Sequence, residues 1–321
     1  TGAAALPGDL LGEVYDDTRS LPLGGASVEA VVPETAVLLA SGLADDRGRY
    51  LLRPGSTQVL VRVTKSGYTT VDRDIITSQG AFSEALDARL TPLAFPTSAN
   101  AAAGATLQSG SGDQLSIAPG ALAENAGVSL TAVSGQGPRK AFPLGWAPLS
   151  IVQIDGPETF VVPATVHFAS RVAVPVHTGA VVARYDETSR AWMPLALVTT
   201  TGEGRAEFGG VPGRGQYALL VADGGTDAPP AASVGQPLAS AADIPLPPDA
   251  TASGKVVPPV GRADDPTPAK ATVTIVGTTA LRSGTWLRGD FVESVMLRAG
   301  GEVSPAPTQQ DLVAYRFPDD E

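Results

Sequence analysis

Cysteine is absent from the 321-residue sequence, histidine occurs only twice, and aromatic residues make up only 5% of the chain. Without cysteine the chain can form neither disulfides nor thiolate metal sites. Because aromatic residues are few, the chain has few side chains that could form the exposed rings against which sugars commonly stack on β-sandwiches. The missing thiols do not fix a compartment, because many bacterial secreted proteins also avoid cysteine.

Positive charge is also scarce, since 22 Lys and Arg stand against 33 Asp and Glu, giving a net charge of −11 and a pI of about 4.7. A uniformly acidic surface repels phosphate backbones, and no basic cluster reverses this locally, so nucleic-acid binding is disfavoured. No apolar run reaches the ~18 residues of a spanning helix, so we expect no membrane span. The chain begins Thr-Gly-Ala-Ala-Ala without Met, which suggests a processed or trimmed start.

Glycine and proline, by contrast, are abundant, with 36 and 28 copies, and 43% of the residues are hydrophobic. This is enough apolar material for real cores, whereas frequent Gly and Pro favour turns between short strands over long helices. At ~100–200 residues per domain, two or three domains are expected. The sequence therefore predicts an all-β protein of tandem antiparallel sandwiches with a smaller C-terminal β unit.

The first predicted unit covers residues 1–92, with strands and turns alternating over 10–92. In "QVLVRVT", Val59, Val61 and Val63 alternate with Leu60, Arg62 and Thr64, as a strand with one buried face requires. In "LADDRGRYLL", Asp45-Asp46-Arg47-Gly48 fits a tight turn, because Gly can take positive φ and Asp can bond its own backbone. The acids of this turn are therefore expected to build a corner.

This unit resembles the carboxypeptidase-regulatory-like family, a transthyretin-like β-sandwich. The resemblance covers about a quarter of the chain and lies in the pattern "GEVYD…PLGGASVEAV…ASGLADDRGRYLL…VLVRVTKSGYTT". The matching positions are Gly12, Val14, Pro22, Leu23, Gly25, Ala26, Val28, Gly48, Tyr50, Gly67 and Tyr68. The resemblance implies a sandwich fold and a non-enzymatic accessory or adhesive role.

Residues 93–103 are interpreted as a small-residue connector, and residues 104–223 as a second β-sandwich. "LSIAPGAL" at 115–122 and the closing "YALLV" at 217–221 resemble the sandwich of ankyrins and netrin receptors. They equally resemble the plug-type sandwich of teneurin-like YD-repeat (Rhs) shell proteins, which the order of the two units favours. Tyr185 and Trp192 flank a predicted hairpin and are expected to face each other across it.

Residues 224–247 are rich in Pro, Ala, Gly and Ser and are interpreted as an extended linker. Residues 248–318 form a predicted small β domain, in which Leu287, Phe291, Val295 and Leu297 share one face. At this size such a unit buries only ~60% of its unfolded surface and should pack on a neighbour. The uncharged, β-branched stretch 271–281 is the edge that we expect another strand to cover.

No catalytic site is predicted. A Ser–His–acid triad would need His167 or His177 beside an activated serine, and no nucleophile-elbow motif accompanies either. His167-Phe168-Ala169-Ser170 resembles the His-Phe-Ser motif at which some ankyrin/netrin-receptor-type sandwiches cleave themselves. Ala169 interrupts that motif and the segment lies mid-domain, so both departures argue against self-cleavage.

No cofactor is predicted, and calcium is the only metal considered. Acidic pairs recur at turns, and Asp16, Asp17, Asp45 and Asp46 are weak calcium candidates, because calcium prefers loop carboxylates and carbonyls. No EF-hand spacing supports them, so turn-forming, solvated Asp is the favoured interpretation. Gly104, Gly110 and Gly112 match no nucleotide-binding spacing. Trp146, Trp192 and Trp286 are scattered, and core or hairpin packing is favoured over sugar binding.

The sequence therefore favours a non-enzymatic structural or adhesive segment of a bacterial cell-surface or secreted protein. The YD-repeat resemblance implies that it could be the N-terminal plug or lid region of a larger shell. Two alternatives remain: a ligand-binding module for carbohydrate or calcium, and an autoproteolytic sandwich. The expected partner is another protein, or a second copy through β-edge contacts.

Overall fold

The computed structural model describes residues 8–77, 82–143, 146–170, 174, 176–201, 204–222 and 232–240, together with four strands further along the chain. Every regular element within these residues is a β-strand, and most strand pairs are antiparallel. The prediction of an all-β, sandwich-type fold is thus confirmed. Among the same residues, no helix is long and apolar enough to cross a membrane.

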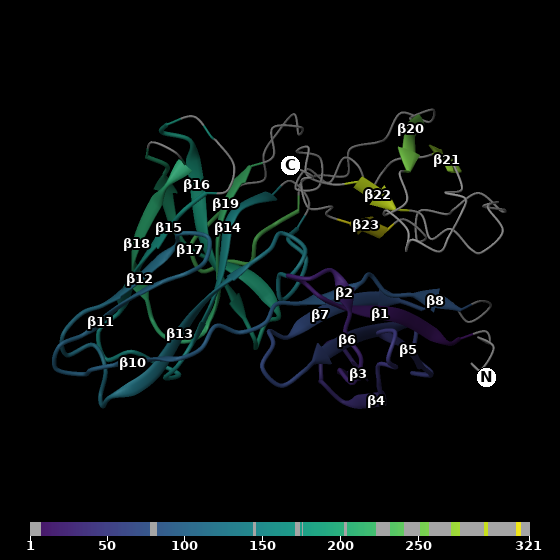
Figure 1. Cartoon of the computed structure of the whole chain (residues 1–321), viewed down its shortest axis with the longest axis horizontal. Helices are drawn as coiled ribbons and strands as arrows, with labels where there is room; N and C mark the ends of the chain where they lie inside the picture. Colours follow the sequence, from purple (N-terminus) through teal and green to yellow (C-terminus); the bar gives the residue numbers. More distant parts are fainter. Residues whose placement is uncertain are drawn as a thin grey trace, which may run out of the picture.

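The first sandwich consists of two sheets (Figure 1, purple to blue). One sheet is centred on β1 (Leu10–Asp16), which pairs antiparallel with β2 (Leu21–Pro22) and β5 (Arg49–Leu52), and parallel with β8 (Ser83–Glu84) and β9 (Ala88–Leu90). The other has the order β4 (Leu38–Leu43), β3 (Ser27–Val31), β6 (Gln58–Thr64) and β7 (Val71–Ile76).

Apolar side chains from both sheets meet between them. Val59, Val61 and Val63 of β6 are buried in this core, as their alternation predicts. Leu60, expected on the opposite face, is also fully buried. The single-face interpretation of β6 is therefore wrong at this position, where both faces of the strand are covered.

The predicted corner at Asp45–Gly48 is confirmed in detail. The Oδ1 atom of Asp45 accepts hydrogen bonds from the backbone N–H groups of Arg47 and Arg49, each at 2.9 Å. Gly48 adopts a φ of 74° and donates its N–H to the carbonyl of Asp45 at 2.8 Å. A carboxylate that binds its own backbone, followed by a residue without a Cβ, thus connects β4 to β5.

The second sandwich also has two sheets (Figure 1, teal to green). The larger has the order β10 (Thr97–Ala99), β13 (Ala126–Val133), β14 (Trp146–Asp155), β19 (Gly215–Ala222), β16 (Gly179–Asp186) and β17 (Ala191–Thr199). The smaller has the order β11 (Ala105–Gln108), β12 (Gln114–Ile117), β15 (Ala164–Phe168) and β18 (Ala206–Val211).

The centre of the six-stranded sheet is buried on both faces. Tyr217 and Leu219 of β19 point into the core between the sheets, whereas Ala218 and Leu220 join a second cluster on the other face. Trp192 belongs to that second cluster and lies opposite Tyr185, with ring centroids 5.7 Å apart, so the predicted cross-hairpin pair is confirmed. The continuous apolar run of β19 reflects its central, doubly covered position.

The connector predicted over 93–103 is wrong in one respect. Thr97–Ala99 form β10, which pairs antiparallel with β13, so the second sandwich takes its first strand from this segment. Small and polar residues gave no alternation to indicate a strand there. The edge position of β10 explains this, because its three residues need contribute little to the core.

The linker predicted over 224–247 is also corrected for residues 232–240. Leu238 is buried against the second cluster, and its N–H donates to the carbonyl of Trp192 at 2.9 Å. The indole N–H of Trp146 donates to the carbonyl of Ala239 at 3.0 Å. These residues therefore cover the outer face of the six-stranded sheet instead of spanning freely between domains.

Beyond residue 240 the structure describes four strands. β20 (Thr251–Val256) pairs with β21 (Ala271–Val276), and β22 (Val292–Ser294) pairs with β23 (Val313–Tyr315), all antiparallel. The predicted apolar face formed by Leu287, Phe291, Val295 and Leu297 lies outside the described residues, as does Trp286. The small C-terminal domain as a whole stays a prediction.

Two glycines allow a test of the corner between β4 and β5. Both Gly48 and Gly55 have positive φ, but a Cβ at Gly48 would lie 2.3 Å from the carbonyl oxygen of Val14, whereas one at Gly55 meets nothing within 4 Å. We expect Gly55→Ala to cost about 1–2 kcal/mol of unfolding free energy from φ alone, and Gly48→Ala to cost clearly more. Urea unfolding of the two variants measures the difference, and equal losses would contradict the clash.

Candidate functional site

One histidine lies on a strand and the other lies in a turn. His167 is on β15, is 43% exposed at its side chain, and its Nδ1 atom lies 3.5 Å from the Oε2 atom of Glu207 on the neighbouring β18. His177 is exposed in the turn before β16, where it has a φ of 63° and donates its N–H to the carbonyl of Thr200. Neither of these described contacts joins an imidazole to a hydroxyl group.

The calcium candidates Asp16 and Asp17 accept hydrogen bonds. Asp16 is buried, and its Oδ1 atom accepts from the N–H and hydroxyl of Thr18 and the N–H of Arg19, while its Oδ2 accepts from the hydroxyl of Tyr68. Burial raises its pKa, but these hydrogen bonds outweigh burial, so the pKa of Asp16 falls below its usual range. Asp16 therefore caps the turn after β1.

Asp45 and Asp46 are exposed at their corner. The hydrogen bond from the N–H of Arg49 is the main reason that the pKa of Asp45 is lowered. Among the described residues, no three His, Asp or Glu side chains gather in a way that would hold a metal ion. The calcium assignment thus stays a prediction, and no cluster of ligands among the described residues supports it.

The segment that resembles a self-cleavage motif is held by a buried carboxylate. The N–H of Ala169 donates to the Oδ1 atom of Asp113 at 2.8 Å, and the hydroxyl of Ser150 donates to the same oxygen at 2.6 Å. The Oδ2 atom accepts from the hydroxyls of Ser109 and Ser111. Asp113 thus fastens the end of β15 to two other segments, which is a structural role.

The tryptophans that the structure describes are not exposed platforms. Trp146 and Trp192 are almost fully buried in the outer cluster of the six-stranded sheet. The indole N–H of Trp192 donates to the carbonyl of Lys140 at 2.9 Å. Core packing of these two residues, the favoured interpretation, is confirmed.

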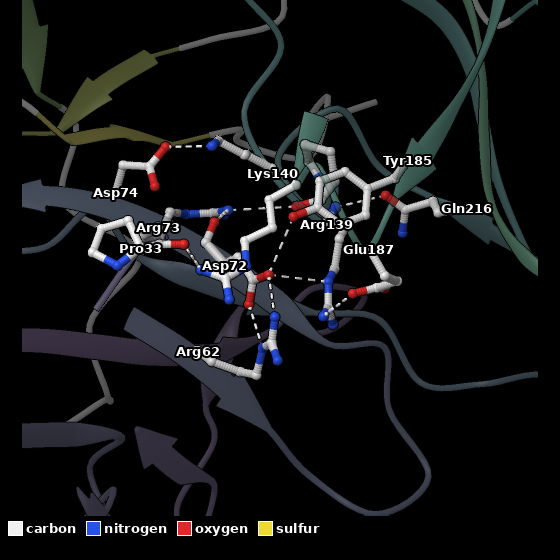
Figure 2. A network of polar contacts seen from close by, with 12 residues as sticks. Pro33, Arg62, Asp72, Arg73, Asp74, Arg139, Lys140, Tyr185, Glu187 and Gln216 are labelled. Atoms are coloured by element: carbon white, nitrogen blue, oxygen red, sulfur yellow. Dashed lines mark hydrogen bonds and ion pairs between the residues drawn. The ribbon is translucent and has the colours of Figure 1, made fainter. Parts of the chain in front are cut away.

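An extended polar cluster lies where the two sandwiches meet, and its centre is Asp72 on β7 (Figure 2). The Asp72 side chain is fully buried, and Arg62 on the adjacent β6 donates to both of its oxygens, at 2.9 and 3.0 Å. The Tyr185 hydroxyl of the second sandwich donates to Oδ2 at 3.3 Å. The hydrogen bond to Asp72 raises the pKa of Arg62 above its usual value.

Arg139 of the second sandwich completes this cluster. Its Nε atom lies 3.3 Å from the Oδ2 atom of Asp72, and its Nη2 donates to Glu187 at 2.8 Å. Its backbone carbonyl accepts the N–H of Asp72 at 2.6 Å, and its own N–H donates to Gln216 at 2.6 Å. Asp72 and Arg139 are therefore joined through both backbone and side chain.

Arg73 binds the loop that carries Arg139. Its guanidinium donates to the carbonyls of Gln136 and Pro138, at 3.3 and 3.4 Å, and to the carbonyl of Asp87 at 3.2 Å. Burial lowers the pKa of Arg73 to about 10, which leaves it charged at neutral pH. A buried cation thus satisfies carbonyl groups from both sandwiches.

Three further contacts surround this centre. Asp17, a weak calcium candidate, instead accepts from the Ser134 hydroxyl of the second sandwich at 2.6 Å and from the Thr91 hydroxyl at 2.9 Å. Lys140 pairs with Asp74 at 2.6 Å, and Arg190 donates to the carbonyl of Pro33.

We call this set the inter-sandwich network, and it consists of Asp17, Pro33, Arg62, Asp72, Arg73, Asp74, Ser134, Gln136, Pro138, Arg139, Lys140, Tyr185, Glu187, Arg190 and Gln216. Its central ion pairs balance two carboxylates, Asp72 and Glu187, against two guanidiniums, Arg62 and Arg139. A buried charge is tolerated only when it is paired and hydrogen-bonded. Relative motion of the sandwiches would therefore expose these charged groups to water or leave them buried without their partners. The two sandwiches therefore contact each other directly and are not held apart by the connector at 93–103.

The sequence reasoning missed this network. "VDRDII" of β7 places Asp72 and Asp74 on one face and Arg73 on the other, so its charges break the alternation expected of a half-buried strand. That break was the available signal. It indicates a strand with polar contacts on both faces, but it does not identify partners more than sixty residues further along the chain.

Scans of the sequence against protein-family models and against curated proteins return no match. Among solved structures, a streptococcal ancillary pilin is similar at 12% identity and a TM-score of 0.22, over 72% of this chain and 60% of that chain. The chain thus spans about 60% of that pilin's length. A superposition this distant adds nothing to the assignment, and the carboxypeptidase-regulatory-like and YD-repeat resemblances stay predictions.

Replacing the central carboxylate tests the network. Asp72→Asn removes the counter-charge of Arg62 and one of the two carboxylates that face Arg139, and we expect a loss of about 3–5 kcal/mol in unfolding free energy. The matched control is Asp74→Asn, two residues along β7, where the carboxylate is half exposed and the expected loss is below about 1 kcal/mol. Urea unfolding followed by tryptophan fluorescence gives both values, and similar losses would show that burial at Asp72 is not decisive.

Alkaline titration tests the buried phenols. Burial raises the pKa of Tyr217 to about 12, and burial together with Asp72 raises that of Tyr185 further. Because the unfolded value is about 10, their contribution to stability is complete below pH ~10 and is lost as the pH rises through the folded pKa. We expect these phenolates to appear in near-ultraviolet absorbance only as circular dichroism reports unfolding. Ionisation well before unfolding would contradict their burial.

Proposed function

We propose that this chain is a non-enzymatic structural segment of a bacterial cell-surface or secreted protein, in which two sandwiches act as one stiff unit that spaces or presents surfaces. The observation that carries the proposal is the inter-sandwich network around Asp72 and Arg139. Many proteins join sandwich domains by linkers that leave them free to move. Here directional contacts fix the two domains at several separate points.

The geometry of those contacts supports stiffness. Asp72–Arg139 and Asp17–Ser134 connect the sandwiches at two places, and Arg190–Pro33 adds a third. A single contact would leave a hinge, whereas several directional contacts remove the rotations between two bodies. Hydrogen bonds also have narrow distance and angle ranges, so sliding of one sandwich on the other is penalised.

The non-enzymatic part of the proposal is supported by the candidate residues themselves. His167 contacts a glutamate, His177 lies in an exposed turn, and Asp113 is occupied by hydroxyl and backbone donors. None of these contacts pairs an imidazole with a hydroxyl nucleophile, as covalent catalysis by a Ser–His pair requires.

The finer assignment, an N-terminal plug or lid region of a YD-repeat shell, rests on the order of a regulatory-like unit followed by a plug-like sandwich. A plug that closes a shell has to keep its shape under contact from one side, and a fixed pair of sandwiches meets that need. The described part of the chain contains no segment of such a shell, so sequence continuing into Tyr-Asp repeats is the observation that would support this assignment.

Stiffness is measurable, because a chain without cysteine accepts spin labels at chosen sites only. Ser66→Cys in an exposed turn of the first sandwich and Thr106→Cys on β11 of the second provide one label in each body. We expect one narrow distance distribution by double electron–electron resonance in dilute samples, and a clearly broader one when Asp72→Ala is added. A broad distribution in the parent double-cysteine protein would overturn the proposal.

The alternative functions predict different outcomes from simple assays. Specific binding on a glycan array, or a rise in melting temperature with millimolar calcium, would favour a ligand-binding module. Intact-mass fragments ending near residue 169 would favour autoproteolysis. A stiff, uncleaved protein that binds neither ligand supports the structural role.

A further inference from the structure

The first and last strands of the first sandwich lie side by side and run in the same direction. β1 pairs in parallel with β8, where Leu10 lies opposite Ser83, and with β9, where Asp16 lies opposite Leu90. Its other neighbours, β2 and β5, are antiparallel to it. The chain therefore enters this sandwich along β1 and leaves it along β9 without a change of direction.

This common direction decides how tension along the chain acts on the strands. A pull on the chain before β1 and a pull on the chain after β9 act at opposite ends of the parallel pair, so they slide one strand along the other. All the hydrogen bonds between the strands then carry the load together. If the two pulls act at the same end of a pair, the strands separate sideways and their bonds break one after another. Parallel first and last strands therefore resist lengthwise extension.

The parallel strands lead towards the second sandwich. Figure 1 shows β8, which pairs with the start of β1, at the end of the first sandwich away from the second. At the other end Asp17, directly after β1, accepts from the hydroxyl of Ser134 of the second sandwich at 2.6 Å. Thr91, directly after β9, donates its hydroxyl to the same carboxylate at 2.9 Å. Because the chain leaves the first sandwich at this boundary, tension between the sandwiches is directed along β1 and β9.

Backbone hydrogen bonds connect these strands from one end of β1 to the other. Near its start, the N–H of Ala85 donates to the carbonyl of Leu11 at 2.8 Å. At its end, the N–H of Asp17 donates to the carbonyl of Leu90 at 2.9 Å. A hydrogen bond tolerates only a narrow range of distances, so sliding by a fraction of one residue breaks both of these bonds.

Sliding is also opposed on the other sides of the two strands. Leu10 and Val14 of β1 are fully buried in the core of the first sandwich, so pulling β1 lengthwise has to draw both side chains through packed apolar surroundings. The exit segment is bonded on its second side, where the N–H of Thr69 donates to the carbonyl of Thr91 at 2.9 Å. Neither strand can therefore move alone.

We propose that the first sandwich bears tensile load along the chain, with β1 and its parallel neighbours β8 and β9 resisting that load by shear. Force enters through β1 and leaves through the segment after β9. Because β1 also pairs with β2 and β5, drawing it out breaks those bonds as well. That load acts on the protein in use rests on the proposed structural role, whereas the resistance follows from the strand directions alone.

Single-molecule stretching of the full chain through two pairs of attachment points tests this resistance. In the lengthwise arrangement, a handle fused before Thr1 and the thiol of Phe95→Cys load the parallel strands from opposite ends. In the matched control, the thiols of Arg19→Cys and Phe95→Cys load them from the same end. Both replaced side chains are exposed, and the chain has no other cysteine. We expect the lengthwise rupture force to be higher by about twofold or more, because its hydrogen bonds break together.

The two arrangements load the same fold in different directions, so a difference in rupture force reports the direction of load and not the equilibrium stability. The second sandwich follows residue 95 and carries no load in either arrangement. Equal rupture forces, or a lower force in the lengthwise arrangement, would overturn the proposal. The spin-label distances are measured without force, so failure of the proposed stiffness and failure of this load-bearing role are told apart.

Discussion

The carboxylate of Asp72 is buried at the boundary between two sandwiches, and the arrangement of the molecule depends on its being satisfied there. Removing a carboxylate from water costs several kcal/mol unless opposite charges and hydrogen bonds replace the solvent. Arg62 supplies two hydrogen bonds from the same sandwich, and Arg139 and Tyr185 supply contacts from the other. Because its partners come from both bodies, the carboxylate can be satisfied only when the sandwiches are docked.

The apolar packing of the second sandwich places those partners. Phe142 contacts Trp192 in the outer cluster of the six-stranded sheet, with ring centroids 4.6 Å apart, and the indole of Trp192 binds the carbonyl of Lys140. Lys140 is the neighbour of Arg139 in the chain. The hydrophobic cluster thus fixes the loop from which Arg139 reaches Asp72, so burial of apolar surface and pairing of charge act on the same few residues.

Local rules predicted the elements of the fold well. The alternation of Val59, Val61 and Val63, the Asp45 corner and the Tyr185–Trp192 pair all depend on residues close together in the chain or in one hairpin. The inter-sandwich network depends on pairs such as Asp72 and Arg139, which lie 67 positions apart. Alternation of apolar and polar residues indicates which face of a strand is buried in its own domain. It does not indicate that the charged face will contact another domain. The candidate site could therefore be recognised only once the two sandwiches were seen in contact.

The contacts between the sandwiches also affect the edges of the sheets. Contacts between sandwiches cover β7, and residues 232–240 cover part of β17, so docking and edge protection are achieved by the same segments. β4 lies at the opposite end of its sheet from β7. A strand in that position is usually protected by charge or proline. Its six residues contain neither, so the docking that covers the edge of β7 leaves the edge of β4 without this protection.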